Sequence, residues 1–360
     1  MKKNASMIAI ARKCGVSAMT VSRALRHNHC VNQATRRKIL AAAARISYQP
    51  NGRTGRPREQ SKNFRQPVRI IVEANLGGAN LYHAYLLGAI EMALAKHECD
   101  CLLRTYDGNY DNFVWLCDVL RSEISLPTMI VGYFSLEKLR TLLQLAPDAL
   151  LVDYTENPRL TCPYDSVGFD NIEASRIAVR HLLEIGRRRI LLMKGHPDHS
   201  FSMDIEKGYC DVLELSGIEF DNHLVVSADF TAAGAYQRTL DSIDRGLKFD
   251  AVFTNDEMAL GVMRALSEKG KLIPEHVAVA GCDGLSFGSF ITPSLTTVVL
   301  DYAELGRVAG EHLLASKERK RPSMRIRLVP RLEIRESTIG LMRIGKEQIN
   351  RKAKNNEGKT

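Results

Sequence analysis

The chain contains 360 residues, of which 45% are hydrophobic and 25% charged, and its formal net charge is +9. These values are ordinary for a globular protein, and the length allows two or three domains. The sequence has no apolar run long enough to span a membrane and no hydrophobic segment typical of a secretory signal, so we expect a cytoplasmic protein. Its eight cysteines are then expected to be reduced. None of them is paired at the CxxC spacing of a zinc or redox site, and we predict neither a metal nor a cofactor.

The positive charge is concentrated at the N-terminus. Residues 1–66 hold fifteen Lys or Arg residues and a single acidic residue, Glu59, whereas the rest of the chain has five more acidic than basic residues. A segment of this charge density repels itself unless it meets a polyanion, and DNA is the usual one. The alternative is a solvated basic tail, but such tails lack capped helices with apolar periodicity.

The first fifty residues have the pattern of a helix-turn-helix. Gly15 separates two short helical segments, where a residue free to adopt positive φ can turn the chain, and Ser17 follows as an N-cap. A third helical pattern spans Gln33–Ser47, with a predicted apolar side formed by Ile39, Leu40, Ala43, Ala44 and Ile46. We therefore predict an all-α helix-turn-helix domain over residues 1–51.

Residues 52–67 read as a basic linker. Their glycines and prolines disfavour a stable helix. Arg53, Arg56 and Arg58 surround Gly55 and Pro57, and such a thin cationic segment suits the narrow minor groove of A·T-rich DNA. It resembles the Gly-Arg-Pro core of AT-hook peptides, although a plain tether is the alternative interpretation.

From residue 68 onward, short apolar strands alternate with amphipathic helices. The predicted strands are Val68–Ala74, Asp100–Thr105, Thr128–Gly132, Ala149–Asp153, Arg189–Lys194, Asp250–Thr254 and Val277–Cys282. The predicted helices are Leu81–His97, Asn112–Ser122, Leu136–Leu145, Ile172–Ile185, Ile205–Ser216, Ala232–Arg245, Glu257–Lys269 and Tyr302–Ala315. Repeated βα units predict parallel sheets covered by helices, and the length of the segment favours two α/β subdomains facing a ligand cleft. Residues 344–360 are polar and are expected to be disordered.

Several segments together resemble the lactose-repressor/galactose-repressor (LacI/GalR) family over about residues 6–340. The matching segments are Gly15–Ser17, Thr20–Arg23, Tyr48–Asn51, Val167–Asn171, His181–Gly186, Thr254–Gly261, Pro293–Val298 and Ile334–Thr338. The resemblance implies a homodimeric regulator that binds a near-palindromic operator and responds to a small effector in a periplasmic-binding-protein-like domain. It places that domain at 68–343, with an N-subdomain at about 68–168 and 301–329 and a C-subdomain at about 169–300 and 330–343.

The resemblance also assigns the DNA-contacting side chains. Ala18, Met19 and Arg23 match positions that read base edges, and the same surface includes Ser17, Thr20 and Ser22. Arg23 has two interpretations, a bidentate contact to guanine or a phosphate contact. Relatives place a hinge helix after this domain and insert a leucine into the minor groove. Pro57 occupies the leucine position here, so we expect an extended arm instead.

Polar residues at strand ends are the effector-binding candidates. Asp153, Asn255 and Asp283 follow or end predicted strands and match effector positions of the family, as do Tyr82 and Tyr302. Asp256, by contrast, is interpreted as a helix cap.

One expected effector residue is absent from the sequence. The position at which sugar-binding relatives carry an arginine is Ile205, and Lys207 or Arg176 are the remaining sources of a cation. The effector class stays open between a neutral sugar, a sugar acid and a nucleoside.

The sequence contains short motifs that are typical of enzymes. Gly284–Gly288 spells GxSxG after a strand, and Asp301 and His312 follow in the order of a hydrolase triad. His196 and His199 are separated by Pro197 and are interpreted as an exposed loop rather than metal ligands. We predict a dimeric repressor and no enzyme. The alternative is a cleft-lobed ligand-binding or hydrolytic protein whose basic segment is a non-specific tether.

Overall fold

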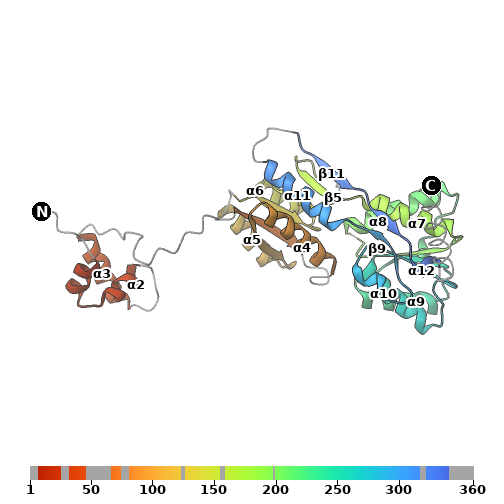
Figure 1. Cartoon of the computed structure of the whole chain (residues 1–360), viewed down its shortest axis with the longest axis horizontal. Coiled ribbons are helices and arrows are strands. Elements are labelled where there is room, and N and C mark those ends of the chain that lie inside the picture. The colour runs from red at the N-terminus through yellow and green to blue at the C-terminus, as the bar shows by residue number, and fades with distance from the viewer. Residues whose placement is uncertain are drawn as a thin grey trace, which may run out of the picture. The chain divides into compact units, whose positions relative to one another are not determined.

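The computed structural model describes residues 7–25, 32–45, 66–73, 81–122, 126–154, 159–197, 199–316 and 322–339 (Figure 1). It consists of two compact units, Met1–Phe64 and Arg65–Thr360. Arg53, Arg56 and Arg58 lie outside the described residues, as does the segment 344–360. Within the described ranges, no helix is long and apolar enough to cross a membrane.

The first unit contains three helices, α1 (Met7–Cys14), α2 (Ala18–Leu25) and α3 (Gln33–Arg45). Gly15 has φ +67°, and the Ser17 hydroxyl accepts the N–H of Thr20 at 3.0 Å, which confirms the predicted turn and cap. The buried core comprises Ile10, Ala11, Val21, Ala24, Ile39, Ala42 and Ala43.

Of the predicted apolar side of α3, Ile39 and Ala43 are confirmed and Leu40 was wrong, while the side chain of Ala44 and all of Ile46 lie outside the described part. Leu40 is 44% exposed, whereas Ala42 is buried beside Ile39 and Ala43. The reason is the helical period, because positions i, i+3 and i+4 share one face and Leu40 lies about 100° away from Ile39.

One lobe of the second unit, here the N-lobe, is built on a six-stranded parallel sheet in the order β11-β5-β4-β3-β1-β2. Its strands are β1 (Gln66–Glu73), β2 (Cys99–Tyr106), β3 (Thr128–Val131), β4 (Leu150–Val152), β5 (Asp165–Phe169) and β11 (Arg325–Leu328). Helices α4 (Leu81–Lys96) and α11 (Tyr302–Ser316) cover one face, and α5 (Tyr110–Ser122) and α6 (Leu136–Leu145) cover the other (Figure 1). Continuous apolar strands such as β3 are the expected result of burial on both faces.

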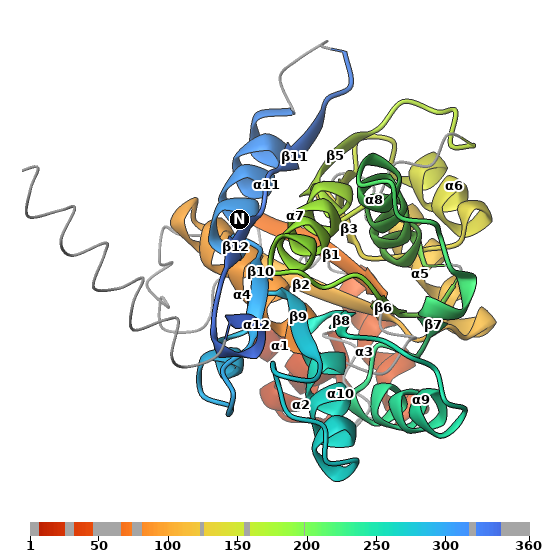
Figure 2. The same cartoon turned by 90° about the vertical axis from the view of Figure 1, so that its right-hand side faces the viewer.

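The C-lobe contains a second six-stranded sheet in the order β12-β10-β9-β8-β6-β7 (Figure 2). Its strands are β6 (Ile190–Lys194), β7 (Val225–Ser227), β8 (Ala251–Phe253), β9 (Ala278–Asp283), β10 (Thr296–Val299) and β12 (Arg331–Glu333), of which β12 is antiparallel to β10. Helices α7 (Asn171–Glu184) and α8 (Ser200–Leu215) pack on one face, and α9 (Ala232–Asp244) and α10 (Asp256–Glu268) pack on the other. A short helix, α12 (Glu336–Ile339), ends the described chain.

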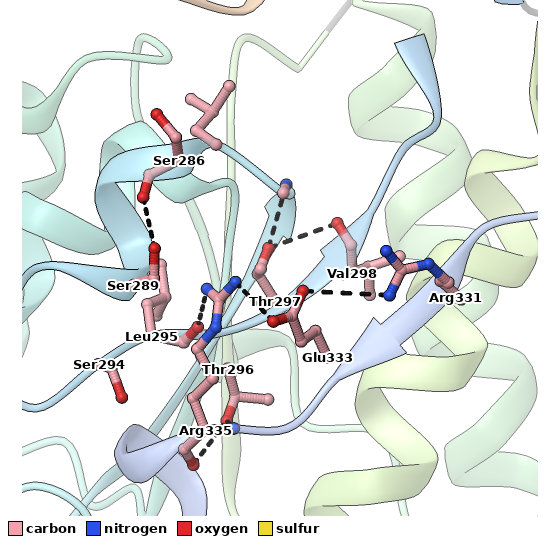
Figure 3. Close-up of polar contacts among 12 residues, drawn as sticks. Ser286, Ser289, Ser294, Leu295, Thr296, Thr297, Val298, Arg331, Glu333 and Arg335 are labelled. Atoms are coloured by element: carbon pink, nitrogen blue, oxygen red, sulfur yellow. Dashed lines mark hydrogen bonds and ion pairs between the residues drawn. The ribbon is translucent and has the colours of Figure 1, made fainter. Parts of the chain in front are cut away.

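The chain crosses between the lobes three times, from β5 to α7, from β10 to α11 and from β11 to β12. Arg335 anchors the C-lobe side of the third crossing. Its guanidinium donates to the Leu295 carbonyl at 2.8 Å and pairs with Glu333 at 3.0 Å (Figure 3). Because parallel strands of both sheets deliver their carboxyl ends toward these crossings, the facing loops form the walls of a cleft.

The predicted fold class is confirmed, and each predicted strand overlaps an observed one. The strands β5, β7, β10, β11 and β12 were not predicted, because they are short and several carry polar residues or glycine. Helix α8 begins five residues earlier than predicted. His199 caps it, since its Nδ1 accepts the N–H of Phe201 at 3.2 Å.

Candidate functional site

A cavity of about 60 Å³ lies between the two lobes, at the strand ends. The N-lobe contributes Glu73, Tyr82, His83, Gly132 and Asp153, and the C-lobe contributes His199, Phe201, Phe230, Asn255 and Asp283. An engineered cavity that holds benzene measures about 150 Å³, so a sugar ring requires the lobes to part slightly from this arrangement. A ligand in this cavity would contact both lobes.

Four of the predicted effector residues line this cavity together: Tyr82, Asp153, Asn255 and Asp283. Tyr302 lies directly behind them, with its ring centroid 5.7 Å from that of Tyr82. Burial raises the pKa of Asp153 to about 6, although a hydrogen bond from Tyr82 and the charge of Arg327 oppose the shift. The two lobes thus supply hydroxyl, amide and carboxyl groups that face a common space.

Ile205 does not line the cavity. It is 3% exposed and packs in the core of the C-lobe, where its carbonyl accepts the Ser175 hydroxyl at 2.6 Å. The two alternative cations are also engaged elsewhere, because Arg176 pairs with Asp211 at 2.6 Å and Lys207 pairs with the same carboxylate at 3.6 Å. Neither lines the cavity.

The interpretation of Asp256 as a helix cap was wrong by one residue. Asn255 caps α10, since its Oδ1 accepts the N–H of Met258 at 2.8 Å. Asp256 is fully buried and accepts the Thr297 hydroxyl at 2.5 Å and the N–H of Leu285 at 2.7 Å. These bonds tie β10 and the loop after β9 to the start of α10, and they fix the segment that carries Asp283.

The aromatic part of the cavity was not predicted. The His199 ring lies between Tyr133 and Phe230, at centroid distances of 4.9 and 5.0 Å, and not in an exposed loop. Burial, with smaller contributions from His83 and His196, lowers the pKa of His199 to about 4, so its ring is neutral at physiological pH. Phe230 has φ +64°, and a Cβ at Gly195 would collide with its ring.

The remaining unpredicted residues, Glu73, His83, Gly132 and Phe201, also lie near strand ends or helix starts. The available signal was positional, because Glu73 ends β1 and Gly132 follows β3. The loop that carries Phe230 follows β7, which the sequence pattern did not reveal.

The GxSxG segment does not assemble a triad among the described residues. Ser286 lies in a short 3-10 turn, Ser286–Ser289, where its main-chain carbonyl accepts the Ser289 hydroxyl (Figure 3). Its own hydroxyl lies 2.6 Å from that of Tyr85, in the opposite lobe. His312 instead binds Asp165 at 2.7 Å, and Asp301 caps α11 by accepting the N–H of Glu304 at 3.0 Å. The part of the chain that the structure describes also holds no cluster of three His, Cys, Asp or Glu side chains arranged for a metal ion.

The predicted DNA-contacting residues 17–23 begin just before α2 and continue through most of it. Ala18 and Met19 are exposed, Met19 by 64% of its surface, and Thr20 is half-buried with its hydroxyl 2.8 Å from that of Ser17. The backbone of Ser22 and Arg23 continues this helix, while their side chains are outside the described part.

A basic helix-turn-helix unit followed by a two-lobed unit with a cavity between its lobes defines the class of ligand-controlled DNA-binding regulators. Comparison with known proteins supports this class. Residues 6–51 match the bacterial regulatory proteins of the lacI family, and residues 179–338 match the periplasmic binding protein-like domain. The chain therefore combines a lacI-family helix-turn-helix domain with a periplasmic-binding-protein-like domain and is a DNA-binding transcriptional regulator, which confirms the resemblance found in its sequence.

Two relatives illustrate the match. The HTH-type transcriptional regulator AscG of Escherichia coli is 28% identical over 83% of this chain and 88% of its own length. Catabolite control protein A of Priestia megaterium is 26% identical over 93% of this chain and 99% of its own length. Both are regulators rather than enzymes by name.

A solved complex of the transcriptional regulator CelR with cellobiose has a TM-score of 0.68 and 26% identity, covering 93% of this chain and all of that one. The Lac repressor dimer bound to operator, with a TM-score of 0.66 and 22% identity, covers 94% of this chain and all of that one, and it shows the shared fold.

Proposed function

We propose that this regulator is a cytoplasmic repressor that binds a near-palindromic operator as a homodimer and changes its operator affinity when a small sugar-like effector enters the inter-lobe cavity. The observation that carries the proposal is that both lobes contribute polar side chains to one cavity, Tyr82 and Asp153 from one and Asn255 and Asp283 from the other. A ligand that contacts both lobes favours one arrangement of the lobes over others, which is the requirement for effector control. The cellobiose bound by CelR supports a sugar-like ligand.

The DNA contacts follow the same proposal. Ala18 and Met19 offer apolar surface to thymine methyl groups, and Arg23 binds the edge of a guanine. Ser17, Thr20 and Ser22 belong to the same DNA-contacting segment, and Arg53, Arg56 and Arg58 enter the minor groove as an extended arm. A dimer supplies two such helices for major grooves about 34 Å apart. The proposal includes the domain limits expected from the sequence, 1–51 for the helix-turn-helix domain and 68–343 for the effector-binding domain.

The experiment that tests the proposal is selection of DNA ligands from a random pool with the full-length protein, followed by binding assays at near-physiological salt. We expect a near-palindromic site whose affinity changes when one small polyol is added. Arg23→Ala should weaken binding by about 1–3 kcal/mol, with the loss concentrated at one base pair of each half-site. The absence of any preference over scrambled DNA, with and without polyols, would contradict the proposal.

A uniform loss across all sequences in the Arg23→Ala assay would assign Arg23 to a phosphate. Exposed Arg121 pairs with Asp118 in the N-lobe, and Arg121→Ala is the matched control that should leave operator binding unchanged.

A further inference from the structure

The ionisable side chains that line the inter-lobe cavity are carboxyl and imidazole groups. Glu73 and Asp153 line it from the N-lobe, and Asp283 lines it from the C-lobe. None of the described residues that line it is Lys or Arg. Burial lowers the pKa values of His83 and His199, so their rings do not supply a positive charge at physiological pH. Burial, followed by the negative charges of Asp256 and Asp153, raises the pKa of Asp283 well above its usual range, so a bound cation favours its ionised form.

Arg327, Lys194 and Arg335 hydrogen-bond or pair with groups that do not line the cavity, although the charge of Arg327 also acts on Asp153. Arg327 donates to the Ser166 hydroxyl and the Ile326 carbonyl, both at 3.4 Å. Lys194 pairs with Glu206. Arg335 is held by Leu295 and Glu333 (Figure 3). Buried carboxyl groups are usually matched by cations or hydrogen-bond donors, and among the described lining residues no Lys or Arg provides that match from within the cavity.

Asp153 and Asp283 hold unusual backbone conformations on opposite walls. Their φ angles are +57° and +130°, in the region that favours glycine. Such strain persists where the surrounding structure enforces it and is concentrated at binding sites. The bonds of Asp256 to Leu285 and Thr297 provide that constraint beside Asp283. The two carboxyl groups are therefore positioned, one from each lobe, rather than left in mobile loops.

Tyr302 adds a buried polar atom beside these carboxyl groups. The residue is 8% exposed, and its hydroxyl has no hydrogen-bond partner among the described residues. After burial, the negative charge of Asp283 contributes most to raising the pKa of Tyr302, and Asp153 contributes as well. The Tyr302 ring packs against that of Tyr82, which lines the cavity, at a centroid distance of 5.7 Å.

Aromatic rings complete the wall on the C-lobe side. Phe201 and Phe230 line the cavity with His199, and Tyr82 faces them from the N-lobe. Aromatic faces attract cations, and this attraction grows when both groups are shielded from water. Carboxyl oxygens combined with aromatic faces are the recognition chemistry of an ammonium group.

Resting on the effector control proposed above, we propose that the effector carries a protonated amino group, which binds between Asp153 and Asp283 while the rest of the ligand lies against the aromatic wall. The ligand class is a small organic ammonium compound, either an amino sugar or a linear amine. A neutral sugar leaves the acidic walls unneutralised, and a sugar acid adds repulsion.

Titration calorimetry on the full-length protein at neutral pH tests the inference with D-glucosamine, D-glucose, N-acetyl-D-glucosamine, D-glucuronate and putrescine. We expect glucosamine to bind at least about tenfold tighter than glucose or its N-acetyl derivative, because acetylation removes the charge. Tighter binding of putrescine than of glucosamine would retain the ammonium group and assign it to a linear amine. Binding of glucose or glucuronate as tight as that of both amines overturns the inference and leaves effector control intact. If no ligand binds and none changes operator binding, the result contradicts both the ammonium inference and the proposed effector control.

Variants separate charge recognition from folding. Asp153→Asn and Asp283→Asn keep the size of the side chain and remove the charge, and each should reduce the preference for the amine over glucose by about tenfold. Glu219→Gln, at an exposed carboxylate outside the cavity, is the control and should retain the preference. Thermal unfolding should show both Asn variants folded. An amine preference that survives in both Asn variants overturns the placement between these two residues.

Discussion

The helix-turn-helix unit and the two-lobed unit carry their predicted functional residues in opposite environments. In the first, the predicted contact residues Ala18 and Met19 are exposed on one helix, whose described core consists of small and medium side chains. In the second, the candidate site is enclosed, and its ten lining residues come from segments spread between Glu73 and Asp283. The first unit can lose its function through loss of its small core, whereas the second depends on how loops are held against each other.

The largest expected effect is on the small core of the helix-turn-helix unit. Ile39 is fully buried and Leu40 is 44% exposed, although they are neighbours on α3. Ile39→Ala should cost roughly 2–5 kcal/mol, because it removes buried apolar surface and leaves a cavity. This is a large fraction of the stability of a small domain. Calorimetric unfolding of the full chain should then show this unit melting early, with operator binding lost and ligand binding retained.

Leu40→Ala is the matched control for Ile39→Ala and should change stability by less than about 0.5 kcal/mol. Equal losses in the two variants would contradict the observed packing of α3.

The next largest effect concerns the loop that carries Asp283. A Cβ at Gly281 would collide with the carboxylate of Asp256, which binds Thr297 and Leu285. Gly281→Ala should therefore destabilise the C-lobe by about 1–3 kcal/mol, since the buried network must shift. Urea unfolding of the full chain measures this loss, and calorimetry should show weaker ligand binding with operator contacts intact.

Gly310→Ala, in the N-lobe, should instead increase the stability of the protein. Gly310 lies within α11, where an added Cβ would make ordinary contacts at 3.7 Å with Ala93 and Leu94. Alanine should stabilise this helix by roughly 0.5–1 kcal/mol. Equal destabilisation by Gly281→Ala and Gly310→Ala would contradict the different surroundings of these two glycines.

The sequence predicted the two units to different degrees, and the reason is physical. The turn at Gly15 and the cap at Ser17 follow from local backbone chemistry, and both were confirmed. Asp153, Asn255 and Asp283 were found because each follows or ends a predicted strand. His199 and Phe230 were missed because their positions depend on tertiary packing and on β7, which is only three residues long. Ile205, at the position where sugar-binding relatives carry an arginine, packs in the core of the C-lobe, and a match in spacing does not determine which face of a helix meets the core.

The effect of pH on the stability of the second unit, through Asp153 in the cavity, should be smaller than the effects of the substitutions above. Burial raises the pKa of Asp153 from near 4 to about 6, with Asp204 adding to the shift and Tyr82 and Arg327 opposing it. Between these values the unfolded chain is ionised while the folded protein retains the proton. The free energy of unfolding should therefore fall as pH rises from about 4 to about 6.

The affinity for an ammonium ligand should rise by about tenfold over the same interval, because Asp153 becomes ionised. Calorimetry at both ends of the range measures this change, and Asp153→Asn should reduce it. Operator binding measured on the same samples provides the comparison, since the described residues of α2 carry no acidic group. An ammonium affinity that falls as pH rises would contradict the role of Asp153.

The smallest predicted effect falls on a residue that serves both the fold and the proposed DNA surface. Ser17 caps α2 through the N–H of Thr20, and Ser17→Ala should cost about 1 kcal/mol. Hydrogen exchange of the α2 amides in the full chain should accelerate accordingly. Ser17→Asp restores an acceptor for the cap but places a negative charge beside the DNA phosphates, so it should retain slow exchange while weakening operator binding. Ser17→Thr should retain both properties. If Ser17→Asp binds the operator as tightly as the original chain, Ser17 lies away from the phosphates and acts only on the helix.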